Sequence, residues 1–195
     1  GGAPPEHELS LMAEDRLMTD RLVPARFNQV ALSVASRDRS LAFYRDVIGF
    51  THVGGTEAFR GKTTEAVQGM AGAASKVYWL MDDRPYFQLE LFEFESPKAR
   101  LWAAARQPHD VGYSRLRVAV RDLHAVLRRM ADTGLGTVGP VQELHGTLAS
   151  VVYDPDRILI ELQEDRRLAR PRLFGVALSV PDLAVAGRSF VDGLG

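Results

Sequence analysis

The sequence has no cysteine among its 195 residues. Disulfide bonds, thiolate nucleophiles and cysteine-ligated zinc are therefore excluded. No apolar run approaches the roughly 18 residues that a membrane-spanning helix needs, and the N-terminal residues lack the apolar core of a secretory signal. These absences predict a protein that does not enter the membrane and is located in the cytoplasm.

An excess of charge of either sign is also missing. Lysine and arginine together number 24, aspartate and glutamate 25, and the formal net charge is −1. No basic stripe indicates nucleic-acid binding, and no block of like charge indicates an interaction tail. The 46% of hydrophobic residues are enough for the core of one or two domains. We therefore expect no nucleic-acid partner.

One short segment occurs twice. "RFNQVALSV" at 26–34 returns as "RLFGVALSV" at 172–180, after a spacing of 146 without a gap. Alternation of apolar and small polar residues predicts a strand in both copies. A helix is predicted over 36–50, with its apolar stripe on one side and Gly49 at its end.

The order strand-helix-strand-strand-strand occurs twice, over residues 26–95 and 113–165. Within the first unit, the Gly- and Ala-rich stretch 54–75 is expected to be a loop with a short helix. Residues 172–195 repeat only the strand and the helix, so we predict an incomplete third module and a longer source protein. The alternative is a natural C-terminal strand and helix that pairs with a neighbour. Residues 1–17 are expected to be a disordered leader or cloning remnant.

The paired modules resemble the vicinal oxygen chelate superfamily. The resemblance rests on "QVALSV…SLAFYRDVIGF", "FQLELFEF" and "DPDRILIEL" together with the module order. That superfamily includes glyoxalase I, methylmalonyl-CoA epimerase, extradiol dioxygenases and bleomycin or fosfomycin resistance proteins. The resemblance implies an α+β fold in which paired β-α-β-β-β modules form a cup-shaped mixed sheet, here a glyoxalase-like domain at 24–165. Because this fold carries many chemistries, the family alone does not fix the activity.

The resemblance also implies positions for a metal site. Relatives hold a divalent ion with residues from the first and last strand of each module, and the matching positions are Gln29, Glu90, Arg115 and Glu161. Glutamate and glutamine oxygens suit Mn, Fe, Zn, Ni or Mg. Arg115 cannot be a ligand, because arginine has no acceptor lone pair and keeps its proton. The expected metal site, Gln29, Glu90 and Glu161, is therefore non-standard, and an ion pair of Arg115 with a glutamate is its competitor.

Further side chains alternate onto the face that the cup would enclose. Gln88 and Phe92 accompany Glu90 on one strand, and Arg117 follows Arg115 on another. Two arginines facing two glutamates would balance charge without a metal. The planar fork of Arg117 suits a carboxylate or phosphate. We therefore assign Arg115, Arg117, Gln88 and Phe92 to substrate binding.

Two functions follow from the resemblance. One is a metal-dependent lyase, isomerase or dioxygenase, in which Gln29, Glu90 and Glu161 hold the ion and Glu90 or Glu161 acts as the catalytic base. The other is binding of a small anionic or vicinal-oxygen ligand in the cup, as in resistance proteins that bind drugs without a metal. Because modules in this superfamily assemble across chains and residues 172–195 would expose a strand edge, a homodimer or a swapped module is expected.

Overall fold

The protein is described by a computed structural model that covers residues 28–100 and 106–194. The expected leader, 1–17, lies outside the described residues. The first module comprises β1 (Gln29–Val34), α2 (Arg37–Ala42), the π-helix η1 (Phe43–Ile48), β2 (Thr51–Arg60), α3 (Lys62–Gln68), β3 (Ala74–Met81) and β4 (Gln88–Ser96). The second comprises β5 (Gly112–Val120), α4 (Leu123–Asp132), β6 (Gln142–Leu144), β7 (Thr147–Tyr153) and β8 (Leu159–Glu164), and it is followed by β9 (Arg172–Ser179) and α5 (Leu183–Leu194).

Two mixed sheets form the protein's framework. One has the strand order β1-β4-β3-β2 and the other β6-β7-β8-β5-β9. In each module the first strand pairs parallel with the last, β1 with β4 and β5 with β8, and the remaining neighbours are antiparallel. This confirms the predicted α+β class with β-α-β-β-β modules. The backbone hydrogen bonds of the described residues divide these strands into two sheets.

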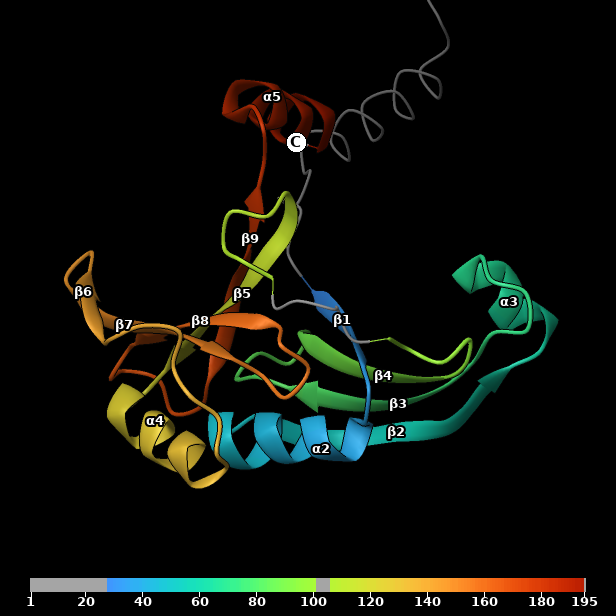
Figure 1. The fold of residues 1–195 in the computed structure, drawn as a ribbon, viewed down its shortest axis with the longest axis horizontal. Coiled ribbons are helices and arrows are strands. Elements are labelled where there is room, and N and C mark those ends of the chain that lie inside the picture. The colour runs from blue at the N-terminus through green and yellow to red at the C-terminus, as the bar shows by residue number, and fades with distance from the viewer. Residues whose placement is uncertain (1–27, 101–105, 195) are drawn as a thin grey trace, which may run out of the picture. The chain divides into compact units, whose positions relative to one another are not determined.

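The helical segment α2–η1 of the first module and α4 of the second lie on one side of the sheets (Figure 1). Arg129 of α4 donates from Nε and Nη2 to the carbonyl oxygen of Val47 in η1, at 3.0 and 2.8 Å. Apolar side chains from both modules pack there into one core, because alternating strand residues face the helices. Its members include Leu32, Val34, Tyr44, Ile48, Leu89, Leu91, Leu116, Val118, Leu123, Val126, Met130, Ile160 and Leu162.

The predicted first helix is present but changes its winding. Ser36 caps it by accepting a hydrogen bond from the Arg39 N–H, and Gly49 ends it with a positive φ of 106°. Between them, α2 gives way to the π-helix η1. Its wider turn allows the adjacent Phe43 and Tyr44 both to face the core, which a regular amphipathic pattern does not indicate.

The stretch 54–75 differs from the expected loop. β2 continues to Arg60, and only then does α3 begin. Irregularities in the pairing of β2 with β3 fall between His52 and Gly54 and between Thr56 and Phe59. Because these irregularities interrupt the two-residue alternation, the part of β2 that lies within 54–75 has no strand signature in the sequence.

The second copy of the repeated segment, β9, is the edge strand of the five-stranded sheet. It pairs antiparallel with β5, so that Gly175 lies opposite Arg117 and Val176 opposite Leu116. β9 belongs to the compact unit Asn28–Pro181, whereas α5 belongs to a separate unit. No strand of the described residues pairs with the other edge of β9.

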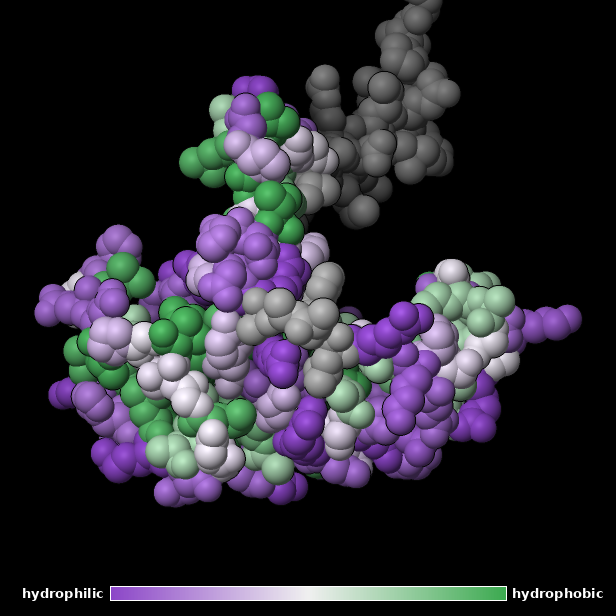
Figure 2. Space-filling model, viewed as in Figure 1, coloured by the Kyte–Doolittle hydropathy of each residue, from purple (hydrophilic) through white to green (hydrophobic). Residues whose placement is uncertain are grey.

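The surface of the two modules is largely hydrophilic on the face shown in Figure 2, with apolar side chains scattered among polar ones. α5 exposes several apolar side chains, among them Leu183, Val185, Phe190 and Val191. No helix of the described residues is long and apolar enough to span a membrane.

Candidate functional site

The two modules place their predicted site residues at equivalent positions. Gln29 and Glu90 lie on the adjacent parallel strands β1 and β4, and Arg115 and Glu161 lie on the adjacent parallel strands β5 and β8. In each pair, alternation directs the side chains away from the helix-covered core. The modules therefore bring Gln29 together with Glu90, and Arg115 together with Glu161.

Glu161 is the centre of the second module's polar cluster. Its carboxylate accepts from Arg115 Nε at 2.6 Å, Arg117 Nε at 2.9 Å and Gln163 Nε2 at 2.7 Å. The side chain of Glu161 is only 5% exposed, whereas Arg115 and Arg117 keep 29% and 35% of theirs in solvent. Burial acts to raise the pKa of Glu161, but the hydrogen bonds from the two arginines and Gln163 outweigh it, and the pKa is lowered. Two cations thus share one carboxylate, leaving an excess positive charge.

Glu90 has a different environment in the first module. It accepts a hydrogen bond from Trp79 Nε1 at 3.0 Å and another from the side chain of Gln29. Burial raises the pKa of Glu90, and these two neutral donors only partly offset the effect. Glu90 and Glu161 share none of these partners, so equivalent glutamates have opposite pKa shifts.

An aromatic row lies on the same face of the first sheet. The rings of Phe59 and Phe92 stack with centroids 6.1 Å apart, and those of Phe92 and Phe94 also lie 6.1 Å apart. Phe92 was predicted from its strand, but Phe59 was not, because the sequence gives no strand signature there. Trp79 was also missed as a partner of Glu90, although its place opposite Glu90 follows once β3 and β4 pair. Gln88 is half-buried at the start of β4.

A cavity of about 830 Å³ lies beside Gln163, whereas Arg115, Arg117 and Glu161 are not among its lining residues. Small-molecule sites commonly have volumes of roughly 300–1,000 Å³. Ala119 and Gln163 line its sheet side, and Arg172 and Phe174 of β9 line another side. A second hollow of about 750 Å³ lies beside β1, where Ala31, Ser33 and Phe94 contribute. Both modules therefore have space on the face that carries the polar clusters.

One of the predicted metal-binding residues, Glu161, has both carboxylate oxygens occupied by hydrogen bonds. Both oxygens of Glu161 already accept hydrogen bonds from cations, Oε2 from Arg115 and Oε1 from Arg117. A divalent ion placed there would be repelled by two guanidinium groups. Within 28–100 and 106–194, no three His, Cys, Asp or Glu residues come together in a way that could hold a metal ion. The set of Gln29, Glu90 and Glu161 stays a prediction, and the bonds of Glu161 argue against it.

Comparison with known protein families shows the family to which the chain belongs. Residues 26–162 match the Glyoxalase/Bleomycin resistance protein/Dioxygenase superfamily. The chain belongs to this superfamily. A search of curated proteins finds no match.

Solved structures of the superfamily share the fold. A glyoxalase family protein from Bacillus cereus superposes with a TM-score of 0.66 at 22% identity, over 74% of this chain and 96% of its own. Glyoxalase I from Zea mays gives a TM-score of 0.61 at 19% identity, over 87% of this chain and 55% of its own. A domain from Frankia sp. gives 0.52 at 18% identity, over 73% of this chain and 98% of its own. The chain thus spans about half of the maize enzyme, and these identities establish the fold alone.

Proposed function

We propose that this superfamily member binds a small organic anion in its cup and that binding does not require a metal ion. The observation that carries the proposal is the sharing of Glu161 by Arg115 and Arg117. One carboxylate neutralises only one of the two cations, and the remaining charge suits an anion.

The arginines are arranged to receive a carboxylate or phosphate. Both ion pairs with Glu161 use the Nε atom, so the terminal nitrogens of Arg115 and Arg117 are not used in them. Glu161 restrains the two side chains before the ligand arrives, which lowers the entropy lost on binding. Gln163 holds Oε1 of Glu161 from another side and lines the cavity. In the other half, Gln88, Glu90 and Phe92 would contact the remainder of the ligand.

The second candidate function is a metal-dependent lyase, isomerase or dioxygenase. The raised pKa of Glu90 favours it, because a more basic carboxylate is a better proton acceptor. Gln29, Glu90 and Glu161 would hold Mn, Fe, Zn, Ni or Mg, which would act as a Lewis acid on the substrate oxygens. This function requires Glu161 to exchange its arginine partners for the ion.

Metal analysis and ligand titration on the same protein distinguish the two candidates. The chain is purified without chelator or nickel resin, and its metal content is measured by mass spectrometry before and after incubation with manganese, iron, zinc and nickel. We expect no stoichiometric metal, and we expect benzoate or phenyl phosphate to shift the NMR resonances of the Arg115 and Arg117 Nε–H groups. Arg45→Ala, which removes an exposed arginine paired with Asp46, is the control and should bind as the native chain does.

One equivalent of a divalent ion that is lost in Glu90→Gln or Glu161→Gln would overturn the proposal in favour of the enzyme. Anions that leave both arginine resonances unchanged would overturn it as well.

We also expect the chain to associate as a homodimer, because the outer edge of β9 has no strand partner among the described residues and an open edge is a template for pairing. Light scattering at micromolar concentration tests this, and a monomer would contradict it.

A further inference from the structure

β9 reaches the candidate site although it lies outside the residues that match the superfamily, 26–162. The pairing of β9 with β5 is irregular between Arg117 and Val118, where Phe174 is the additional residue. The Arg117 guanidinium carbon lies 4.7 Å from the centroid of the Phe174 ring. Phe174 also lines the cavity of about 830 Å³ and is 37% exposed.

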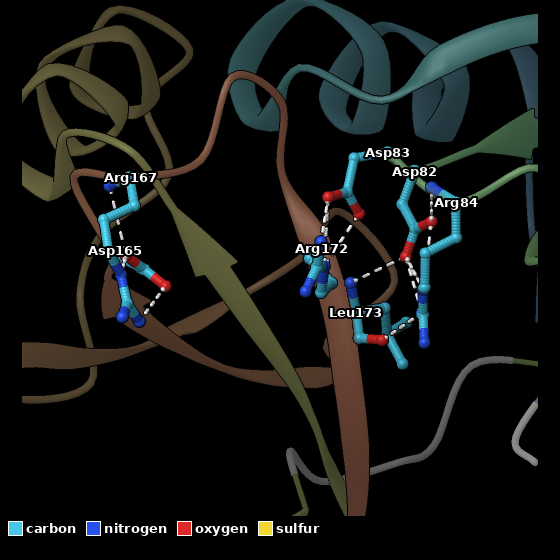
Figure 3. Close-up of polar contacts among 7 residues, drawn as sticks. All are labelled: Asp82, Asp83, Arg84, Asp165, Arg167, Arg172 and Leu173. Carbon is cyan, nitrogen blue, oxygen red and sulfur yellow. Dashed lines mark hydrogen bonds and ion pairs between the residues drawn. The ribbon is translucent and has the colours of Figure 1, made fainter.

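The start of β9 is fixed by the turn between β3 and β4 (Figure 3). The buried carboxylate of Asp82 accepts from Leu173 N at 3.2 Å and from Arg84 Nη2 at 2.6 Å. The same Arg84 nitrogen donates to the Leu173 carbonyl oxygen at 2.5 Å. Two side chains of the first module therefore bind both backbone polar groups of Leu173, whose own side chain is fully buried.

A second ion pair holds the preceding residue. Arg172 donates to both carboxylate oxygens of Asp83, and this bidentate contact lowers the pKa of Asp83. Upstream, Asp165 donates its backbone N–H to the Val120 carbonyl oxygen at 2.8 Å. Its carboxylate pairs with Arg167, whose hydrogen bonds lower the pKa of Asp165 to about 2. The chain is thus held on both sides of the link between β8 and β9.

These contacts leave little freedom at Phe174, the residue that follows the two anchored positions. Glu161 fixes the Nε edge of Arg117, and the Phe174 ring lies over the guanidinium group. A guanidinium held at one edge and against a ring keeps its terminal nitrogens in one direction. Phe174 therefore contacts Arg117 and also lines the cavity.

We propose that β9 forms a wall of the ligand site and that Phe174 is a positioning residue for Arg117. Together, Arg117 and Phe174 select anions whose acid group is attached to a flat aromatic body. The acid group contacts Arg117 and the aromatic body contacts the exposed part of Phe174. The choice of ligand class rests on the proposed function, whereas the positioning of Arg117 does not.

The positioning is tested in the full chain without any ligand. The ¹⁵N–¹H resonance of Arg117 Nε reports the ring current of Phe174. Phe174→Ala and Phe174→Leu should both move this resonance and Phe174→Tyr should restore it, while Leu retains apolar bulk without a ring. Phe59→Leu, which removes a ring from the other sheet, should leave it unchanged. An Arg117 resonance that is the same in Phe174→Ala and the native chain overturns the inference.

Ligand selectivity is tested by titrating benzoate and acetate against the same resonance. The native chain should bind benzoate more tightly than acetate. Phe174→Ala should weaken both acids, because both lose the positioned Arg117, and it should weaken benzoate by a further factor of roughly two to ten, the equivalent of one lost aromatic contact. A benzoate preference that survives in Phe174→Ala overturns the inference.

Asp82→Ala provides a second route to the same result. It releases the start of β9 while keeping Phe174, and it should reduce both the ring-current shift and the benzoate preference. Both readouts unchanged in Asp82→Ala would overturn the role of the anchored strand. Failure of the native chain to bind either acid, with the ring-current shift intact, would refute the proposed function and not the positioning of Arg117.

Discussion

Replacing the equivalent glutamates by glutamine should lower the free energy of unfolding at Glu161 but not at Glu90. Glu161→Gln leaves Arg115 and Arg117 without their shared carboxylate. Removing one partner of a buried ion pair costs about 3–5 kcal/mol. Because the two arginine side chains are 29% and 35% exposed, water compensates part of this loss. We expect the free energy of unfolding to fall by about 2 kcal/mol, which lowers the Tm by about 4–8 °C for a chain of this size.

Glu90→Gln is the matched control, because Glu90 occupies the equivalent position without a cationic partner. Its raised pKa means that burial disfavours the ionised form, so glutamine should cause no loss of stability at neutral pH and can give a small gain. The pH dependence separates the two variants further. The folded pKa of Glu161 is lowered, so its stabilising contribution is present above its ordinary pKa of 4.5 and is lost as the pH falls through the folded value.

The assay is urea unfolding of both variants and the native chain at neutral pH and at acidic pH below the folded pKa of Glu161. The reasoning predicts a large deficit for Glu161→Gln at neutral pH that shrinks on acidification. Equal losses for the two variants at neutral pH would refute it, as would a Glu161→Gln deficit that is unchanged in acid.

Three further predictions concern turns. Burial raises the pKa of Asp154 from its ordinary 3.8 to about 6, so its stabilising contribution is present below pH 3.8 and is lost as the pH rises through about 6. The free energy of unfolding should therefore fall by about 3 kcal/mol between about pH 4 and pH 7. Asp154→Asn should abolish this fall, as measured by urea unfolding across the same pH range. Arg157→Gly should raise the Tm by an amount equivalent to about 0.5–1 kcal/mol, because Arg157 has a positive φ of 65°; a lower Tm would contradict this. Asp82→Ala should lower the free energy of unfolding by about 1–3 kcal/mol and accelerate hydrogen exchange at Leu173 N–H. Asp83→Ala breaks a more exposed ion pair and should lower it by less than about 1 kcal/mol. Equal losses in the two variants would show that Asp82 does not anchor the strand.

The order of elements was predictable because it depends on local patterns. Alternation identified β1, β4, β5 and β8, and the apolar stripe with Gly49 at its end identified the first helix. The same patterns failed where the backbone is irregular. β2 was missed within 54–75, where its irregular pairing breaks the alternation.

The candidate site was predictable only within a module. The family resemblance supplied the positions of Arg115 and Glu161, and an ion pair of Arg115 with a glutamate was one of two alternatives for them. The contact of Arg117 with Phe174 and the binding of Leu173 by Asp82 were not predictable, since they depend on where β9 docks. A strand has the same alternation of side chains whichever sheet edge it pairs with, so its sequence does not predict which edge that is.

The repeated segment shows that nearly the same sequence can pair with different strands and in different directions. β1 and β9 share the four residues VALS, yet β1 runs parallel to β4 and β9 runs antiparallel to β5. The choice is made by neighbours: Asp82 and Arg84 recognise only the backbone of Leu173, a contact that any residue except proline could supply. The same strand sequence can therefore join different sheet edges, and the turn that contacts its backbone helps to decide which edge it joins.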